Sequence, residues 1–113
     1  MSNLEKAIAI AMDAHAGQLD KAGQPYILHP LRLMFRFEIE VEQIVAVMHD
    51  VVEDSEVTLG DLRGSLFSEQ IVEAIDCLTK REGEAYEDFI TRVLSNDLAS
   101  GTPFAISFWI LAK

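Results

Sequence analysis

The sequence is poor in cysteine, in proline and in positive charge. Its single cysteine, Cys77, excludes an intrachain disulfide and fits a reducing, cytoplasmic setting. Only 9 lysines and arginines oppose 19 acidic residues, and the net charge of −10 argues against binding to a nucleic-acid polymer or an anionic membrane. The N-terminus lacks a secretory pattern, because Glu5 and Lys6 stand where an apolar region would begin. A small phosphorylated partner is still compatible with this charge if a metal and a few local cations reverse the potential inside a cleft.

Half of the 113 residues are hydrophobic, enough for one domain with a modest core. Apolar spacing and capping residues predict six helices, and almost nothing before residue 103 favours a strand. The first is capped by Ser2 and runs to about residue 16, and the others cover about residues 30–37, 41–53, 62–66, 68–78 and 84–94. We expect Thr58 and Ser68 to cap the helices over 62–66 and 68–78. The apolar stripes place Met12 and Ala16 of the first helix and Tyr86 of the last toward the core. We therefore predict an all-α, compact single-domain fold.

Four ionisable residues crowd the end of the predicted helix over residues 41–53. His49-Asp50 is followed by Glu53-Asp54, and the spacing of four lets each pair share a helix face. Buried ionisable groups are normally paired or bound to a metal, and an imidazole beside a carboxylate suits a divalent transition metal. A second carboxyl pair one turn later suits the activation of water. The alternative is an ordinary acidic helix end before a loop.

The segment GQLDKAGQPYIL, residues 17–28, is predicted to be a loop before the second helix. Pro30 suits the first turn of that helix and places His29 at its cap. His15 is a metal ligand by residue type, but we expect it to anchor the loop or pack in the core. Tyr26 either stacks on a nucleotide base or packs as a loop aromatic.

Three segments in a fixed order resemble a known family. They are AHAGQLDKAGQPYILHP (residues 14–30), HDVVED (49–54) and the run over residues 58–90. Together they resemble the HD-domain phosphohydrolases, specifically the hydrolase domain of RelA/SpoT proteins and the single-domain small alarmone hydrolases. The resemblance covers roughly residues 5–99, and the combination of GQxxKxGxPYIxHP with HDVVED is specific. It implies a helical HD-domain fold.

The resemblance also implies a metal centre and a reaction. The family pattern places a divalent ion, usually manganese, on His29, His49 and Asp50. It gives Glu53 and Asp54 the task of shaping or activating the water that attacks phosphorus. The family's reaction removes the 3′-pyrophosphate of guanosine tetra- or pentaphosphate, (p)ppGpp, in the bacterial stringent response.

Three residues near the predicted metal centre are candidates for binding the substrate. The resemblance places Lys21 near the nucleotide, and Tyr26 is the candidate for base stacking. Hydrolysis of a pyrophosphate needs cations on the leaving group, and Lys21 and Arg32 are candidates near His29. Lys80 and Arg81 could also meet phosphate, although a solvated helix end is the commoner reason for such residues.

The chain departs from the family pattern at two places. Asp20 stands where the long alarmone hydrolases usually have an arginine, and a carboxylate cannot replace a guanidinium on a base or phosphate. After the NDLA segment at 96–99 no acidic residue follows, so the aspartate that serves the family as a fourth ligand is missing. We interpret residues 1–102 as the HD domain, lacking its last metal-ligand helix, and residues 103–113 as an apolar tail that is truncated or replaced relative to the family. The tail either fills the vacated groove or forms a homo-oligomer interface.

Three functions are compatible with these features. The first is a metal-dependent phosphohydrolase of (p)ppGpp or a similar nucleotide, impaired by the missing ligand. The second is a degenerate HD domain that binds a nucleotide or a protein without catalysis. The third is a structural helical domain that associates through its tail. Retention of three ligand positions together with Glu53-Asp54 favours the first two.

Overall fold

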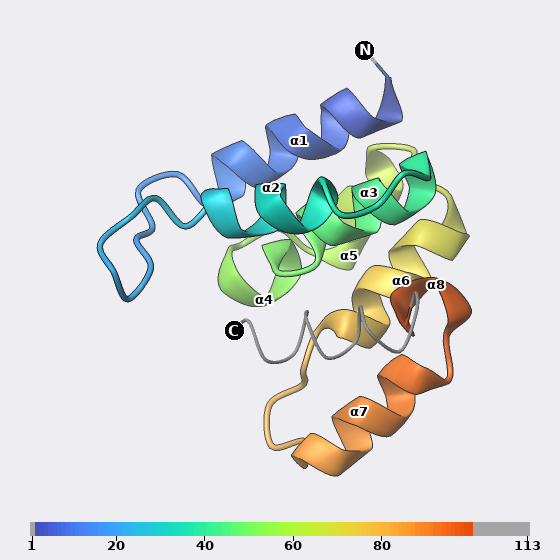
Figure 1. Cartoon of the computed structure of the whole chain (residues 1–113). Helices are drawn as coiled ribbons and strands as arrows, with labels where there is room; N and C mark the ends of the chain where they lie inside the picture. The colour runs from blue at the N-terminus through green and yellow to red at the C-terminus, as the bar shows by residue number, and fades with distance from the viewer. Residues whose placement is uncertain (1, 101–113) are drawn as a thin grey trace.

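The computed structural model describes residues 2–100, and these form helices joined by short connections (Figure 1). The helices are α1 (Asn3–Ala14), α2 (Leu28–Met34), α3 (Glu40–Met48), α4 (Val51–Asp54), α5 (Leu59–Gly64), α6 (Glu69–Leu78), α7 (Tyr86–Leu94) and α8 (Asp97–Ser100). The only extended pairing in this part of the chain is an isolated bridge between Leu19 and Pro25. The prediction of an all-α fold is confirmed.

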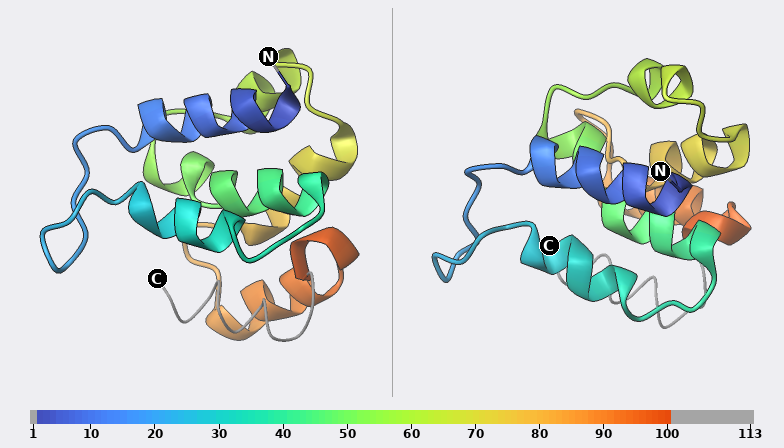
Figure 2. Two further views of the ribbon diagram at one scale, coloured as in Figure 1. Left: turned by 45° about the horizontal axis from the view of Figure 1, so that its top comes forward. Right: turned by 90° about the horizontal axis from the view of Figure 1, so that it is seen from above.

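Helix α3 is the centre of the arrangement. It packs against α1 and α2 on one side and against α6 and α8 on the other (Figures 1 and 2). Five consecutive residues of α3, from Ile44 to Met48, are therefore buried, which requires apolar side chains around the whole helix. Ala7 and Ala11 of α1 are also fully buried, and their small side chains suit a close approach of two helices.

Local sequence signals set several helix starts. Ser2 and Thr58 each accept a hydrogen bond from the backbone three residues later, and Glu5 and Asp61 return the bond, so both form capping boxes. Ser68 caps α6 in the same way through the N–H of Ile71. All three caps confirm predictions from the sequence.

The region predicted as one helix over residues 41–53 is two helices. Helix α3 ends at Met48, His49 and Asp50 form a turn, and α4 follows as a separate four-residue helix. Val51 is buried like the residues of α3, so the apolar periodicity continues through the break. The sequence pattern therefore does not reveal where α3 ends. This break, together with the unpredicted α8, accounts for eight helices in the described residues where the sequence predicted six.

Three side chains predicted to face the core do not. Met12 is 56% exposed and Ala16 is exposed, because α1 turns Ala7 and Ala11 toward α3 and ends at Ala14. Tyr86 is 52% exposed, since it is the first residue of α7 and precedes the part of the helix whose side chains are buried.

The predicted apolar tail, residues 103–113, lies outside the described residues, as does the end of the predicted domain at residue 102. Among residues 2–100, no helix combines the length and the apolar character that a membrane crossing requires.

Arg92 ties α7 to the end of α6. Its guanidinium donates to the backbone carbonyls of Asp76 at 2.7 Å and Thr79 at 3.0 Å, and to both carboxylate oxygens of Glu84. The carbonyl of Asp76 also accepts from the N–H of Thr79, so Arg92 adds a second bond there, at a helix end where carbonyls run out of helical partners. The hydrogen bond from Arg92, with a second from the backbone N–H of Arg81, lowers the pKa of Glu84 below its ordinary value of 4.5.

We expect Glu84→Gln to lower the free energy of unfolding at pH 7 relative to the unchanged chain. Because the pKa of Glu84 is lower in the folded state, its stabilisation is complete above the unfolded value of 4.5 and is lost as the pH falls through the folded value. Urea unfolding between pH 7 and pH 3 should show the two proteins converging at the acidic end. Glu82→Gln, an exposed neighbour, is the matched control, and a Glu84→Gln effect that does not change with pH would contradict this assignment.

Candidate metal centre

Two ionisable residues occupy the turn between α3 and α4. The side chain of His49 is 1% exposed and that of Asp50 is not exposed at all. Asp54 remains one turn away, since its N–H donates to the carbonyl of Asp50 at 2.9 Å. The break separates the four residues by environment, because Glu53 and Asp54 are exposed while His49 and Asp50 are buried.

His29 reaches the same place from α2. The sequence predicted it at the helix cap, but Ile27 is the cap and His29 lies inside the first turn, with Pro30 next to it. Proline is tolerated there because the first turn leaves its N–H groups without helical partners. The ring centroids of His29 and His49 are 5.4 Å apart, and one ligand atom from each of His29, His49 and Asp50 lies within 4.8 Å of the others.

The hydrogen bonds of His49 define the chemistry of this cluster. Its Nδ1 lies 2.7 Å from the carbonyl oxygen of Ala46, which can only accept, so Nδ1 carries a proton. Its Nε2 lies 3.0 Å from Oδ2 of Asp50. An imidazole lone pair and a carboxylate oxygen at that separation repel each other unless a positive charge, either a proton or a metal ion, lies near both. The donor set of imidazoles and a carboxylate fits a divalent transition metal.

Tyr26 stands beside this cluster. Its hydroxyl donates a hydrogen bond to Oδ2 of Asp50. The centroid of its ring lies 4.8 Å from that of the His15 ring and 5.7 Å from that of the His29 ring. Burial, the bond to Asp50 and the nearby carboxylates all raise the pKa of Tyr26. The hydroxyl is therefore a permanent donor that orients the Asp50 carboxylate. The packed position favours the loop-aromatic alternative over a free stacking surface.

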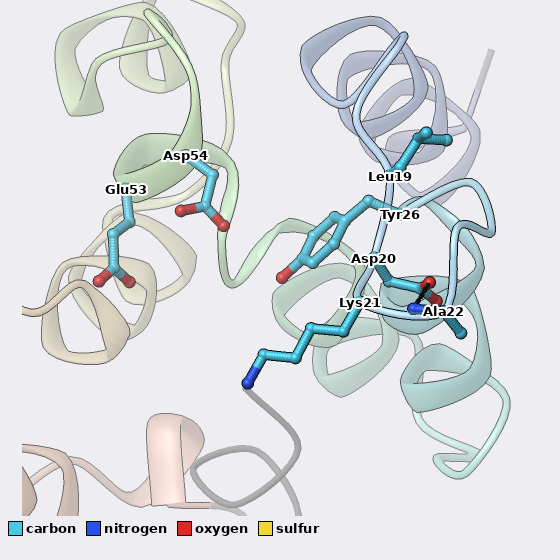
Figure 3. Close-up of a pocket in the computed structure, with 7 residues that line it drawn as sticks. All are labelled: Leu19, Asp20, Lys21, Ala22, Tyr26, Glu53 and Asp54. Atoms are coloured by element: carbon cyan, nitrogen blue, oxygen red, sulfur yellow. Dashed lines mark hydrogen bonds between the residues drawn. The ribbon is translucent and has the colours of Figure 1, made fainter.

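A cleft of about 640 Å³ opens next to Tyr26 (Figure 3). Glu53 and Asp54 of α4 form one side, and the other side comes from the α1–α2 connection, which contributes Leu19, Asp20, Lys21, Ala22 and Tyr26. The volume lies in the range of small-molecule sites. Of the described residues lining this cleft, three are carboxylates and one, Lys21, is a cation. A polyphosphate would therefore need additional positive charge to bind here.

The side chain of Asp20 accepts hydrogen bonds from the backbone of its own loop. Its Oδ1 accepts hydrogen bonds from the N–H groups of Ala22 at 2.8 Å and Gln24 at 2.9 Å. Gly23 completes the turn at φ +82°, a conformation that suits glycine. Asp20 thus shapes the loop from which Lys21 projects.

Arg32, a predicted phosphate-binding residue, lies outside the cleft, and His15, a possible ligand by residue type, lies outside the cluster. Arg32 is exposed on α2 and does not line the cleft. His15 is buried but is not part of the three-residue cluster, and its Nδ1 lies 2.9 Å from Oε1 of Gln18, so it anchors the loop as expected. No role for Gln18 was predicted, although this glutamine is a fixed position of the GQxxKxGxPYIxHP pattern; its hydrogen bond to Asp54 spans 36 residues and could not be inferred from spacing.

Comparison with known proteins shows relatives that match most of the chain. The chain is 34% identical over 89 residues, 75% of its length, to a guanosine-3′,5′-bis(diphosphate) 3′-pyrophosphohydrolase of Vibrio cholerae. It is 30% identical over 78% of its length to the bifunctional (p)ppGpp synthase/hydrolase SpoT of Escherichia coli, and 35% identical over 66% to a pyrophosphohydrolase of Borreliella burgdorferi. The chain spans only 12–13% of the length of these three relatives. No protein-family model matches it.

We expect His49→Ala to weaken the binding of Mn²⁺ by about 100-fold or more, because removing a ligand costs at least as much as removing the residues that support ligands. Isothermal titration of the folded variant measures the affinity. His15→Asn is the matched control, since His15 is equally buried but lies outside the cluster. Equal loss of affinity in both variants would show that the cluster is not the binding site.

Proposed function

The chain belongs to the RelA/SpoT-type (p)ppGpp hydrolase family over the three quarters of its length that its relatives match, and we propose that it is a metal-dependent phosphohydrolase of a guanosine polyphosphate. The observation that carries this proposal is the convergence of His29, His49 and Asp50 beside a cleft lined by three carboxylates and a lysine. The relatives are named for hydrolysis at the 3′-pyrophosphate, and we extend that reaction to this chain.

His29, His49 and Asp50 would hold a divalent ion, with manganese the expected metal from the family resemblance. Such an ion would supply a Lewis acid that neutralises phosphate oxygens and lowers the pKa of water. The fit of the cluster rests on the His49 Nε2 and Asp50 Oδ2 atoms, which are 3.0 Å apart and require positive charge between them. Tyr26 supports the site by donating to the same oxygen of Asp50.

The remaining cleft residues have separate tasks. Glu53 and Asp54 are exposed carboxylates at the end of α4 and can accept a proton from the attacking water. Lys21 projects from the opposite side and can bind a phosphate oxygen of the substrate (Figure 3). Since the cleft carries more negative than positive charge, we expect polyphosphate binding to depend on the metal.

A second function, nucleotide binding without hydrolysis, also has support. The cluster would supply three protein ligands within residues 2–100. A site with three protein ligands keeps open positions for water and substrate but holds its ion less tightly than a fuller set. If metal binding is too weak for turnover, the chain is a degenerate HD domain that binds the nucleotide without hydrolysing it.

We expect the chain with Mn²⁺ to release pyrophosphate from guanosine tetraphosphate, and chelation of the metal to stop the reaction. Glu53→Gln and Asp54→Asn should each lower kcat by about 100-fold or more while leaving Mn²⁺ affinity intact, as proton-transfer groups contribute factors of this size. Glu56→Gln, an exposed acid two residues further on, is the control. Nucleotide binding without turnover would instead support the degenerate domain.

Lys21→Met should raise KM for guanosine tetraphosphate with little change in kcat, because an exposed cation that binds phosphate acts on the ground state and the transition state alike. Lys80→Met removes a cation at the end of α6, outside the cleft, and should leave KM unchanged. Steady-state kinetics at two salt concentrations test both. An equal rise of KM in the two variants would indicate a general charge effect and would exclude a specific role for Lys21.

A further inference from the structure

Gln18 lies at the base of the α1–α2 connection and contacts both sides of the cleft. Its side-chain Nε2 donates to the backbone carbonyl of Asp54 at 2.8 Å, across 36 residues of sequence, and to the carbonyl of Ala14 at 3.3 Å. Its Oε1 accepts from Nδ1 of His15 at 2.9 Å. Its backbone carbonyl accepts from the N–H of Tyr26 at 2.9 Å.

These partners define the orientation of the amide. The carbonyls of Ala14 and Asp54 can only accept, so the NH₂ group must face them and Oε1 must face His15. The backbone N–H of Gln18 also donates, to the carbonyl of His15 at 3.0 Å. Every polar group of Gln18 is thus engaged, which is expensive to disturb in a partly buried residue.

Helix α4 needs such an anchor. It has only four residues, and its cap residue Asp50 makes no side-chain capping bond. Asp54 is its last residue, and both Asp54 and its neighbour Glu53 line the cleft. A bond from Gln18 to the Asp54 carbonyl fixes the end of α4 relative to α1, where the segment leading to Tyr26 is also attached.

We propose that Gln18 is a positioning residue that sets the place of the Asp54 carboxylate in the cleft. The proposal rests on the proposed function only for its kinetic consequence, since the hydrogen bonds exist without turnover. Gln18 is neither a member of the cluster of His29, His49 and Asp50 nor one of the residues that line the cleft. Its effect should therefore pass through Asp54 and not through the metal or the binding of the nucleotide.

The test is Gln18→Met, which keeps the length of the side chain and removes its three side-chain hydrogen bonds, to Ala14, His15 and Asp54. We expect kcat for Mn²⁺-dependent hydrolysis of guanosine tetraphosphate to fall by about 10- to 100-fold, the size expected when a reacting group is misplaced by about 1 Å. KM and Mn²⁺ affinity should not change. Gln24→Met is the matched control, because Gln24 lies in the same loop and is exposed and outside the cleft lining.

A double variant separates positioning from general loss of structure. In an Asp54→Asn background, Gln18→Met should lower kcat no further, because residues that act as a unit are not additive. Independent, multiplying effects would overturn the proposal, as would an unchanged kcat in the single variant.

A second measurement needs no turnover. In nuclear magnetic resonance spectra of the metal-free protein, Gln18→Met should shift the carboxyl carbon of Asp54, while Gln24→Met should leave it in place. If the unchanged chain hydrolyses no nucleotide but the Asp54 signal moves as expected, the proposed function fails and the positioning role stands. An Asp54 signal that does not respond to Gln18→Met overturns the positioning role whatever the activity.

Discussion

The carboxylate of Asp50 is fully buried at the point where α3 ends. Removing a charged carboxylate from water costs several kcal/mol or more unless hydrogen bonds and opposite charge compensate. The chain provides one hydrogen bond from the hydroxyl of Tyr26, and it places the imidazoles of His49 and His29 in the same cluster. Helices α2 and α3 and the loop between α1 and α2 therefore meet around one buried carboxyl group.

This constraint explains why the apolar part of the fold surrounds α3. Ile44 to Met48 are buried on every side, and the polar turn follows them directly, so the cluster lies against the core and the cleft lies just outside it. Low polarity on one side strengthens electrostatic interactions within the cluster. Exposure on the other side leaves Glu53 and Asp54 accessible to a charged ligand. The separation between the buried cluster and the exposed carboxylates of Glu53 and Asp54 follows from the break between α3 and α4.

The sequence could predict features that depend on neighbouring residues. The caps at Ser2, Thr58 and Ser68 were predicted because each needs only a hydroxyl and the following backbone. The break after Met48 was not, since apolar spacing runs through it. His29 and His49 are 20 positions apart, and no spacing rule joins them; the family resemblance did. The family pattern marks Gln18 as a fixed position, but its partner could not be inferred, because a hydrogen bond to a backbone carbonyl 36 residues away follows no spacing rule.

The most direct test of this account is a crystal structure of the protein with Mn²⁺, recorded with anomalous scattering from the metal. The account predicts one anomalous peak within coordination distance of an imidazole nitrogen of His29, an imidazole nitrogen of His49 and a carboxylate oxygen of Asp50. A peak elsewhere, for instance among the exposed acids Asp13, Glu56 and Asp61, or no peak at saturating Mn²⁺, would contradict it.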